Sequence, residues 1–201
     1  KSIFNVIFFA LVVIPLQTGL GLLLALLVNQ KLKGRNFFRT IYFSPVVTAM
    51  VVVSFVWMFL YDKDNGLINQ FIGLIGLQSV NWLGNPNTAM WAIIIMSVWQ
   101  GVGMQMVLFL AGLQGIPDYL YEASRIDGAN AWQNFRYVTL PSLRGVFVFI
   151  IITITIAAFQ LFTQVWVMTN GGPDDATTTV VFNMVRKGFR EQDIAMASAI
   201  G

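Results

Sequence analysis

The residues best suited to chemistry in this chain lie in a short polar stretch, residues 118–141, between two strongly apolar segments. Glu122 stands there beside the small side chains of Ala123 and Ser124, and Asp127 follows five positions after Glu122. A carboxylate set among small side chains suits a charged contact with a closely approaching partner. We therefore expect a docking surface here, the alternative being an ordinary interfacial loop helix.

The amino-acid composition excludes most kinds of catalytic site. The chain has no His and no Cys, so it lacks the commonest general base, the commonest metal ligand and any thiol. It also lacks a Gly-x-x-x-x-Gly-Lys-Ser/Thr phosphate-binding loop. We predict no catalytic residue, no metal site and no cofactor in this chain. The net charge of +3 is small and the basic residues cluster in loops, so we expect no nucleic-acid partner.

Local signals predict a helical hairpin in the polar stretch. Pro117 suits the start of a helix because it lacks a backbone donor and fixes a helical φ. Tyr119–Ile126 would form about two turns, ended by Gly128, which tolerates the left-handed conformation. Asn130 followed by Gln133 has the spacing of a capping box and predicts the start of a second helix.

The rest of the chain is typical of a membrane protein. Its residues are 57% hydrophobic and only 10% charged, against about a quarter charged in soluble domains. Several apolar runs are long enough to cross ~30 Å of hydrocarbon. They cover about 3–28, 41–61, 89–113 and 146–168, and another begins at 194. We predict an all-α, polytopic helical bundle forming one transmembrane domain over 1–201, part of a longer protein, with the lipid bilayer as a partner.

Loop charges predict the orientation. A short loop after the first run is basic and contains no acid: Lys31, Lys33, Arg35 and Arg39. The positive-inside rule makes this loop cytoplasmic. Alternation then places 62–88 outside, 114–145 inside and 169–193 outside. Within the first outer loop, 67–77 reads as a short surface helix, and Trp82 and Trp91 suit the membrane interface.

The polar stretch resembles the EAA motif of permease subunits in binding-protein-dependent ABC importers. The resemblance is carried by Glu122-Ala-Ser-x-x-Asp-Gly128-Ala, then Phe135 and Leu140-Pro141. Ser124 replaces the second Ala of the motif. Other segments are similar to the carbohydrate-uptake branch, which includes maltose, lactose and glycerol-phosphate type permeases: Leu26–Asn29, Asn65–Asn69, Asn81–Gly84, Trp99–Gly101 and Thr169–Pro173.

The resemblance implies a type I ABC importer permease fold with a cytoplasmic coupling helix, located in the inner (plasma) membrane. It implies three partners: a second permease subunit, an ATP-binding subunit dimer and an extracytoplasmic solute-binding protein. ATP and Mg would be bound by the partner ATPase. The residues it implies for ATPase coupling are Tyr121, Glu122, Ala123, Ser124, Arg125, Asp127, Gly128, Ala129, Phe135, Leu140 and Pro141.

Polar side chains inside the third and fourth runs are candidates for solute contact, because buried polar groups in membranes usually face a cavity or protein. Gln160 and Thr163 come first: three positions apart, they are predicted on one helical face, and their placement is similar to sugar-site positions of the maltose relative. The other candidates are Phe159 and Gln164, then Gln100, Gly101, Met104 and Gln105. Helix packing is the equal alternative for each polar side chain, and the favoured one for the glycines at 19, 21, 101 and 103.

Three alternatives remain open at the level of sequence. The chain could serve a secondary transporter or channel without an ATPase, or an ABC permease for a non-sugar solute. A membrane-embedded enzyme is the third. The third and fourth runs contain no Asp, Glu, His, Lys or Arg, which disfavours ion coupling and leaves an enzyme almost no reactive groups.

Overall fold

The computed structural model describes residues 1–30 and 34–201, apart from the side chains of residues 35 and 36. Lys31 and Lys33, two of the bases behind the predicted cytoplasmic loop, lie outside the described residues. The described chain contains helices and no strand, which confirms the predicted all-α fold class. The helices are α1 (Ser2–Asn29), α2 (Arg35–Val47), α3 (Met50–Leu60), α4 (Leu67–Leu74), α5 (Pro86–Gln114), α6 (Asp118–Ile126), α7 (Ala131–Asn134), η1 (Phe135–Thr139), α8 (Leu140–Ser142), α9 (Arg144–Phe159), α10 (Thr163–Met168), α11 (Val180–Val185), η2 (Arg186–Arg190) and α12 (Ile194–Ile200).

The chain divides into two compact units, and the extent of one transmembrane domain over 1–201 stays a prediction. Unit 1 contains residues 1–13, 48–100 and 154–201, and unit 2 contains residues 14–47 and 101–153. Helices α1, α5 and α9 contribute residues to both units. These helices are long enough for their two parts to have different neighbours, which hydropathy along the sequence does not reveal.

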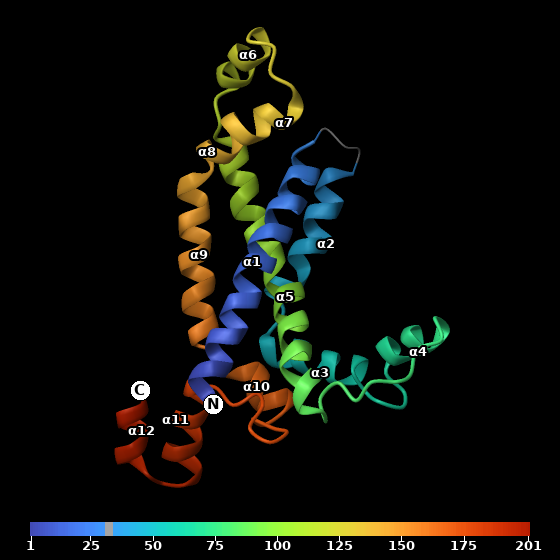
Figure 1. Ribbon diagram of the computed structural model, residues 1–201, viewed down its shortest axis with the longest axis vertical. Helices are drawn as coiled ribbons and strands as arrows, with labels where there is room; N and C mark the ends of the chain where they lie inside the picture. The colour runs from blue at the N-terminus through green and yellow to red at the C-terminus, as the bar shows by residue number, and fades with distance from the viewer. Residues whose placement is uncertain (31–33) are drawn as a thin grey trace. The chain divides into compact units, whose positions relative to one another are not determined.

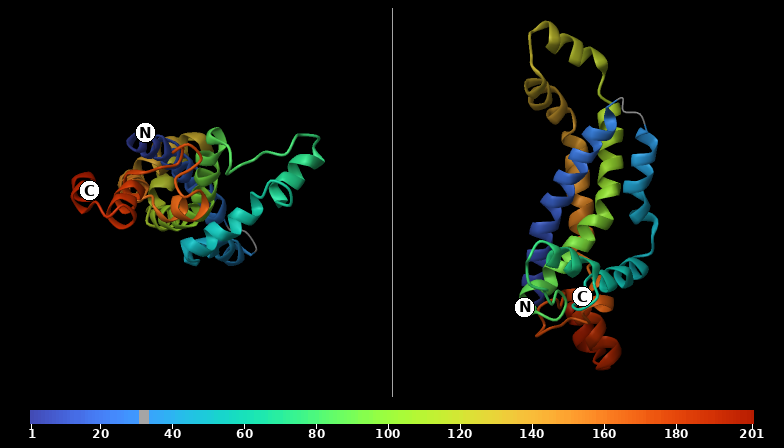
Figure 2. Two further views of the ribbon diagram at one scale, coloured as in Figure 1. Left: turned by 90° about the horizontal axis from the view of Figure 1, so that it is seen from below. Right: turned by 90° about the vertical axis from the view of Figure 1, so that its right-hand side faces the viewer.

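In unit 2, helix α5 lies among α1, α2 and α9, as Figures 1 and 2 show. Glycines make the close approaches. A Cβ added at Gly21 would lie 2.6 Å from the Cβ of Gln105, and one at Gly103 would lie 2.1 Å from the carbonyl oxygen of Tyr42. Gly112 faces side chains at the start of α9 in the same way. Small residues let membrane helices approach closely, as predicted for positions 21 and 103, whereas nothing lies within 4 Å of a Cβ at Gly19.

The helix ends of unit 2 are consistent with the predicted loop alternation. The end of α1, the start of α2, the end of α5 and the start of α9 lie at one end of the unit, and α6 and α7 lie beyond it (Figures 1 and 2). The helix ends that flank the first loop therefore lie on the same side as the loop 114–145, as alternation requires. That this side is cytoplasmic remains a prediction.

Unit 1 is organised around aromatic contacts between α3, α5 and the loop that follows α3. The ring of Trp57 lies 5.6 Å from that of Trp99 and 5.2 Å from that of Tyr61, and Tyr61 lies 5.5 Å from Trp82. The Tyr61 hydroxyl donates a hydrogen bond of 3.0 Å to the backbone oxygen of Ala92. These contacts fix the loop to α5.

Two predicted spans are each divided between two helices. By length and composition, α1 and α5 can cross a membrane alone, whereas residues 37–60 and 131–159 qualify only as broken helix pairs. The first pair is interrupted at Thr48 and Ala49, where Ala49 has an extended backbone (φ −58°, ψ 133°). Gln100 Nε2 lies 3.5 Å from the Thr48 carbonyl oxygen. The predicted span 146–168 is divided at residues 160–162, between α9 and α10. Neither this interruption nor the one at Thr48 and Ala49 contains Pro or Gly, so hydropathy alone reads each span as continuous.

Candidate functional site

The end of α6 is set by local hydrogen bonds that the sequence predicts. Gly128 has φ +79°, and its N–H donates to the carbonyl of Arg125 at 3.1 Å. The N–H of Ala129 donates to the carbonyl of Ser124 at 2.9 Å. This pair of bonds is a Schellman motif, which satisfies the last carbonyls of a helix. The predicted break at Gly128 is confirmed.

The start of α7 is a capping box, also as predicted. The Asn130 side chain accepts a hydrogen bond of 2.9 Å from the N–H of Gln133, and the Gln133 side chain accepts one of 2.8 Å from the N–H of Asn130. The helix then continues through the wide turn η1 into α8. We call residues 118–142 the coupling hairpin. At its turn, backbone groups at the end of α6 and at the start of α7 are hydrogen-bonded by residues of the hairpin itself.

Side-chain hydrogen bonds tie α6 to α7 and η1. Ser124 Oγ donates to Asn134 Oδ1, and Asn134 Nδ2 donates to the carbonyl of Ala129 at 3.4 Å. The hydroxyls of Tyr121 and Thr139 lie 3.0 Å apart. Tyr121 and Ser124 are half-buried, so they hold the hairpin together from within. The EAA resemblance predicts both residues on the coupling surface. It does not predict Asn134 and Thr139, whose types carry no signal in a polar loop.

The outward face of α6 is a stripe that we call the α6 face: Tyr119, Glu122, Ala123 and Ile126. All four are exposed, with Tyr119 at 65% and Ile126 at 87%. Their spacing of three and four positions places them on one side of the helix. Among the described residues, Glu122 has no ion-pair partner within 4 Å. Two large apolar side chains thus flank a small residue and a free carboxylate. The apolar pair, seven positions apart, was the signal that sequence reasoning missed.

The other predicted coupling residues lie beside the α6 face or beyond it. Arg125 and Asp127 are exposed at the end of α6. Phe135 is half-buried, with its ring 5.7 Å from that of Trp132. Leu140 and Pro141 belong to α8 and line a hollow with Arg136, Arg144 and Phe147. The structure therefore brings Glu122 and Ala123 together on one surface and leaves the later motif residues to support the hairpin.

The first group of predicted pathway residues surrounds the interruption between α9 and α10. Phe159 ends α9, Gln160 is exposed in the interruption, and Thr163 and Gln164 begin α10. The prediction that Gln160 and Thr163 share one helical face is wrong, because the helix stops between them. The carbonyl of Leu161 accepts a buried hydrogen bond of 2.7 Å from Thr179 Oγ1 instead of one from a continuing helix.

The second group of predicted pathway residues lies on α5. Gln100 belongs to unit 1, and the others belong to unit 2. Gln100 reaches Thr48 in unit 1. In unit 2, Gln105 is 7% exposed, with its Nε2 3.5 Å from Gln17 Oε1. A Cβ at Gly101 would lie 2.4 Å from the Gln17 amide. Gly101 and Gln105 thus sit in the contact between α1 and α5, which favours the packing alternative, while Met104 is 44% exposed.

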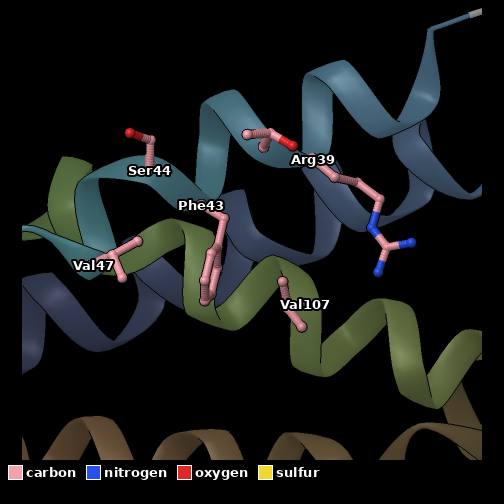
Figure 3. A pocket seen from close by; sticks show the side chains of 6 residues that line it. Arg39, Phe43, Ser44, Val47 and Val107 are labelled. Carbon is pink, nitrogen blue, oxygen red and sulfur yellow. The ribbon is translucent and has the colours of Figure 1, made fainter.

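A hollow of about 440 Å³ lies between α2 and α5 in unit 2. Figure 3 shows Phe43 and Val47 of α2 and Val107 of α5 along it, with the Arg39 guanidinium at one end. None of the predicted pathway residues lines it. Its lining is mixed, because Arg39, Thr40 and Ser44 are polar, whereas Phe43, Val47 and Val107 are apolar.

A family model described as the inner membrane component of binding-protein-dependent transport systems matches residues 17–201. The chain is 39% identical over 202 residues to the trehalose/maltose transport system permease protein of Thermococcus litoralis, covering 99% of this chain and 67% of that protein. It is 34% identical over 200 residues to the arabinooligosaccharides transport system permease protein of Halalkalibacterium halodurans, covering 98% of this chain and 63% of that protein. The chain thus spans about two thirds of the length of these relatives.

Solved structures share the fold. A chain of a bacterial ABC transporter involved in the import of the acidic polysaccharide alginate superposes with a TM-score of 0.90, at 23% sequence identity, covering 100% of this chain and 71% of that chain. A structure of a bacterial alginate ABC transporter in complex with an alginate pentasaccharide-bound periplasmic protein gives the same TM-score at 22% identity, covering 100% and 70%.

Proposed function

The chain belongs to the family of inner membrane components of binding-protein-dependent transport systems, and we propose that it is a transmembrane subunit of an ATP-driven importer of sugars or sugar-like solutes. It forms half of the translocation pathway, and a second permease subunit forms the other half. An ATP-binding subunit dimer supplies ATP and Mg, and an extracytoplasmic solute-binding protein delivers the solute. The names of the trehalose/maltose and arabinooligosaccharide relatives support the solute class.

The observation that carries the proposal is the α6 face on an internally satisfied hairpin. The bonds of Gly128, Asn130 and Ser124 keep the hairpin's shape, so a push on α6 moves the hairpin as one body. Exposed Tyr119 and Ile126 have apolar area to bury in a cleft. Glu122 supplies a charge that fixes the register of the contact.

The test compares variants of the α6 face with a matched variant elsewhere on the hairpin, in the full-length assembly. Tyr119→Ala with Ile126→Ala should release the ATPase during purification and lower solute-stimulated ATP hydrolysis several-fold. Tyr137→Ala is the control, because Tyr137 is 73% exposed on η1, outside this face. Since the changed side chains are exposed, the fold should survive. Unchanged co-purification and unchanged ATP hydrolysis in the double variant would refute the docking role.

The solute contacts of this chain are proposed at the interruption between α9 and α10. Gln160, Thr163 and Gln164 supply amide and hydroxyl groups, and Phe159 supplies an aromatic face for a sugar ring. No acidic or basic residue lies between Ala89 and Leu113 or between Val146 and Met168, which favours a neutral sugar.

Uptake assays with labelled neutral and acidic oligosaccharides test this assignment. The reconstituted transporter should prefer neutral sugars, and Gln160→Ala should raise the KM for uptake while ATPase co-purification is unchanged. Uptake that continues without ATP would instead support the secondary transporter. An unaltered KM in Gln160→Ala and Gln164→Ala variants would remove the interruption from the pathway.

A further inference from the structure

Helix α4, between α3 and α5 in unit 1, has an apolar face that nothing in the described chain covers. Leu67, Phe71 and Leu74 are spaced by four and three positions, so they share one side of the helix. They are 53%, 69% and 82% exposed, and the next residue, Ile75, is 73% exposed. Figures 1 and 2 show α4 standing clear of α10, α11 and α12 of the same unit.

The opposite side of α4 is held by one buried residue, Asn69, which is 6% exposed. Its Nδ2 lies 3.2, 3.1 and 2.9 Å from the carbonyl oxygens of Asp62, Lys63 and Val80. Its Oδ1 accepts from the N–H of Val80 at 3.0 Å and from the indole Nε1 of Trp82 at 3.2 Å. Asn69 therefore uses both its donor and its acceptor groups to keep the polar side of α4 facing its own loop.

Further contacts fix the orientation of α4 relative to α3 and α5 in unit 1. The ring of Trp82 packs 5.5 Å from Tyr61 at the end of α3, and the Tyr61 hydroxyl is bonded to the backbone of α5 at Ala92. The apolar side of α4 is thus turned outward by satisfied polar contacts, and turning it inward would cost those contacts.

The chemistry of this face favours lipid over a protein partner. No residue of α4 is charged, whereas protein interfaces are enriched in Arg, Tyr and Trp and have a polar rim. The preceding helix, α3, also exposes apolar side chains, among them Val52, Phe55 and Phe59. Helix α3 belongs to one of the broken pairs apolar enough to cross a membrane, and six residues separate its end from α4.

We propose that α4 is an interfacial helix that lies on the bilayer surface at the side of the 62–88 loop. Leu67, Phe71 and Leu74 insert at the boundary between headgroups and acyl chains, and Asn69 faces the protein. Short amphipathic helices bind in this way through their buried apolar area. The inference requires a membrane but no particular solute or ATPase.

Spin labels on single cysteines test the proposal directly, because these 201 residues contain no Cys. The full-length protein, freed of any other cysteine and placed in phosphatidylcholine nanodiscs, would carry Phe71→Cys or Leu74→Cys. Gly73→Cys is the matched control, since Gly73 is exposed on the same helix but two positions from Phe71, outside the apolar face, and nothing lies within 4 Å of an added Cβ there. Collision rates with oxygen, which concentrates in lipid, and with a water-soluble nickel chelate are then compared.

Labels at 71 and 74 should collide preferentially with oxygen, and their oxygen-to-nickel ratio should exceed that at 73 several-fold. A nickel-dominated label at 71 would overturn the proposal by placing the face in water. Shielding from both agents, or immobilisation only when solute-binding protein is added, would overturn it in favour of a protein partner. In an Asn69→Ala background the difference between 71 and 73 should shrink, because the helix loses the contacts that orient it.

Discussion

The coupling hairpin and the segment 160–182 both interrupt helices, and they do so by different means. At the hairpin, the bonds that end α6 and begin α7 join residues within five positions of each other, at Gly128 and Asn130. At the other interruption, the carbonyl of Leu161 accepts a hydrogen bond from the hydroxyl of Thr179, 18 residues away. The hydroxyl of Thr178 similarly donates a hydrogen bond of 3.0 Å to the carbonyl of Gly171.

The hairpin is therefore held by local contacts, whereas segment 160–182 is held by tertiary contacts. The hairpin carries its own end signals and leaves its outer surface exposed, so it can serve as a separate body for a partner. Segment 160–182 depends on three consecutive threonines, Thr177–Thr179, all at most 2% exposed. Changes in the segment should therefore weaken the whole of unit 1, whereas changes at the hairpin turn should act locally.

The largest effect is expected from Gly171→Ala. Gly171 has φ +86°, and an added Cβ would lie 2.7 Å from the ring of Phe182 and 3.0 Å from Thr178 Oγ1. Backbone strain and overpacking together should lower the free energy of unfolding by about 3 kcal/mol or more. Thermal unfolding of the full-length protein in detergent measures this. Gly145→Ala is the control, because nothing lies within 4 Å of its Cβ, and it should leave Tm unchanged or higher.

Thr179→Val should come next. It removes the hydroxyl that donates to Leu161 and that also accepts a hydrogen bond from the N–H of Phe182 at 3.2 Å. An unsatisfied buried carbonyl and a lost helix cap together cost about 2 kcal/mol. Thr179→Ser keeps the hydroxyl and should recover most of the Tm. Equal stability of the Val and Ser variants would mean that the hydroxyl does not maintain the interruption.

Gly128→Ala tests the hairpin side of the comparison. The left-handed φ is strained by a Cβ, but open space surrounds it, so the cost should be about 1 kcal/mol. Hydrogen exchange should rise in residues 118–134 while the global Tm changes little. Gly128→Asn should be milder, because Asn tolerates this conformation. A fall in Tm as large as that of Gly171→Ala would break the proposed distinction.

Asn130→Ala should have the smallest effect, about 0.5–1 kcal/mol, because it removes one side-chain cap. The faster amide exchange should be confined to the first turn of α7, where Gln133 receives the cap. Asn130→Asp keeps a cap acceptor and serves as the matched control. Exchange that spreads into unit 1 would contradict the local character of the hairpin.

The same distinction explains what could be predicted from the sequence. The all-α class, the end of α6 at Gly128, the capping box at Asn130 and the short helix after Gly66 follow from local signals, and all appear in the structure. Hydropathy could locate the apolar runs, but it could not divide them. At the interruptions, the carbonyls of Thr48 and Leu161 accept hydrogen bonds from Gln100 and Thr179, and the distance in sequence hides both contacts.

The candidate site was predicted in part for the same reason. The Glu122-Ala123 surface follows from the motif, whereas the inward roles of Tyr121 and Ser124 depend on partners in η1 and α7. Periodicity could have added Tyr119 and Ile126, since both lie on the helical stripe of Glu122 and Ala123. Burial of Gln105 against Gln17 could not be read from either run alone.

The bond between Thr179 and Leu161 also has a consequence for biosynthesis. A ribosome that adds about 5–20 residues per second needs about one to four seconds to make the chain between these two positions. During that interval the Leu161 carbonyl has no hydroxyl to accept from, and lipid offers no water in its place. A continuous helix through 160–162 is then the arrangement that satisfies the backbone. We therefore expect this stretch to enter the bilayer as one unbroken helix and to open at Leu161 only after Thr179 has also left the ribosome.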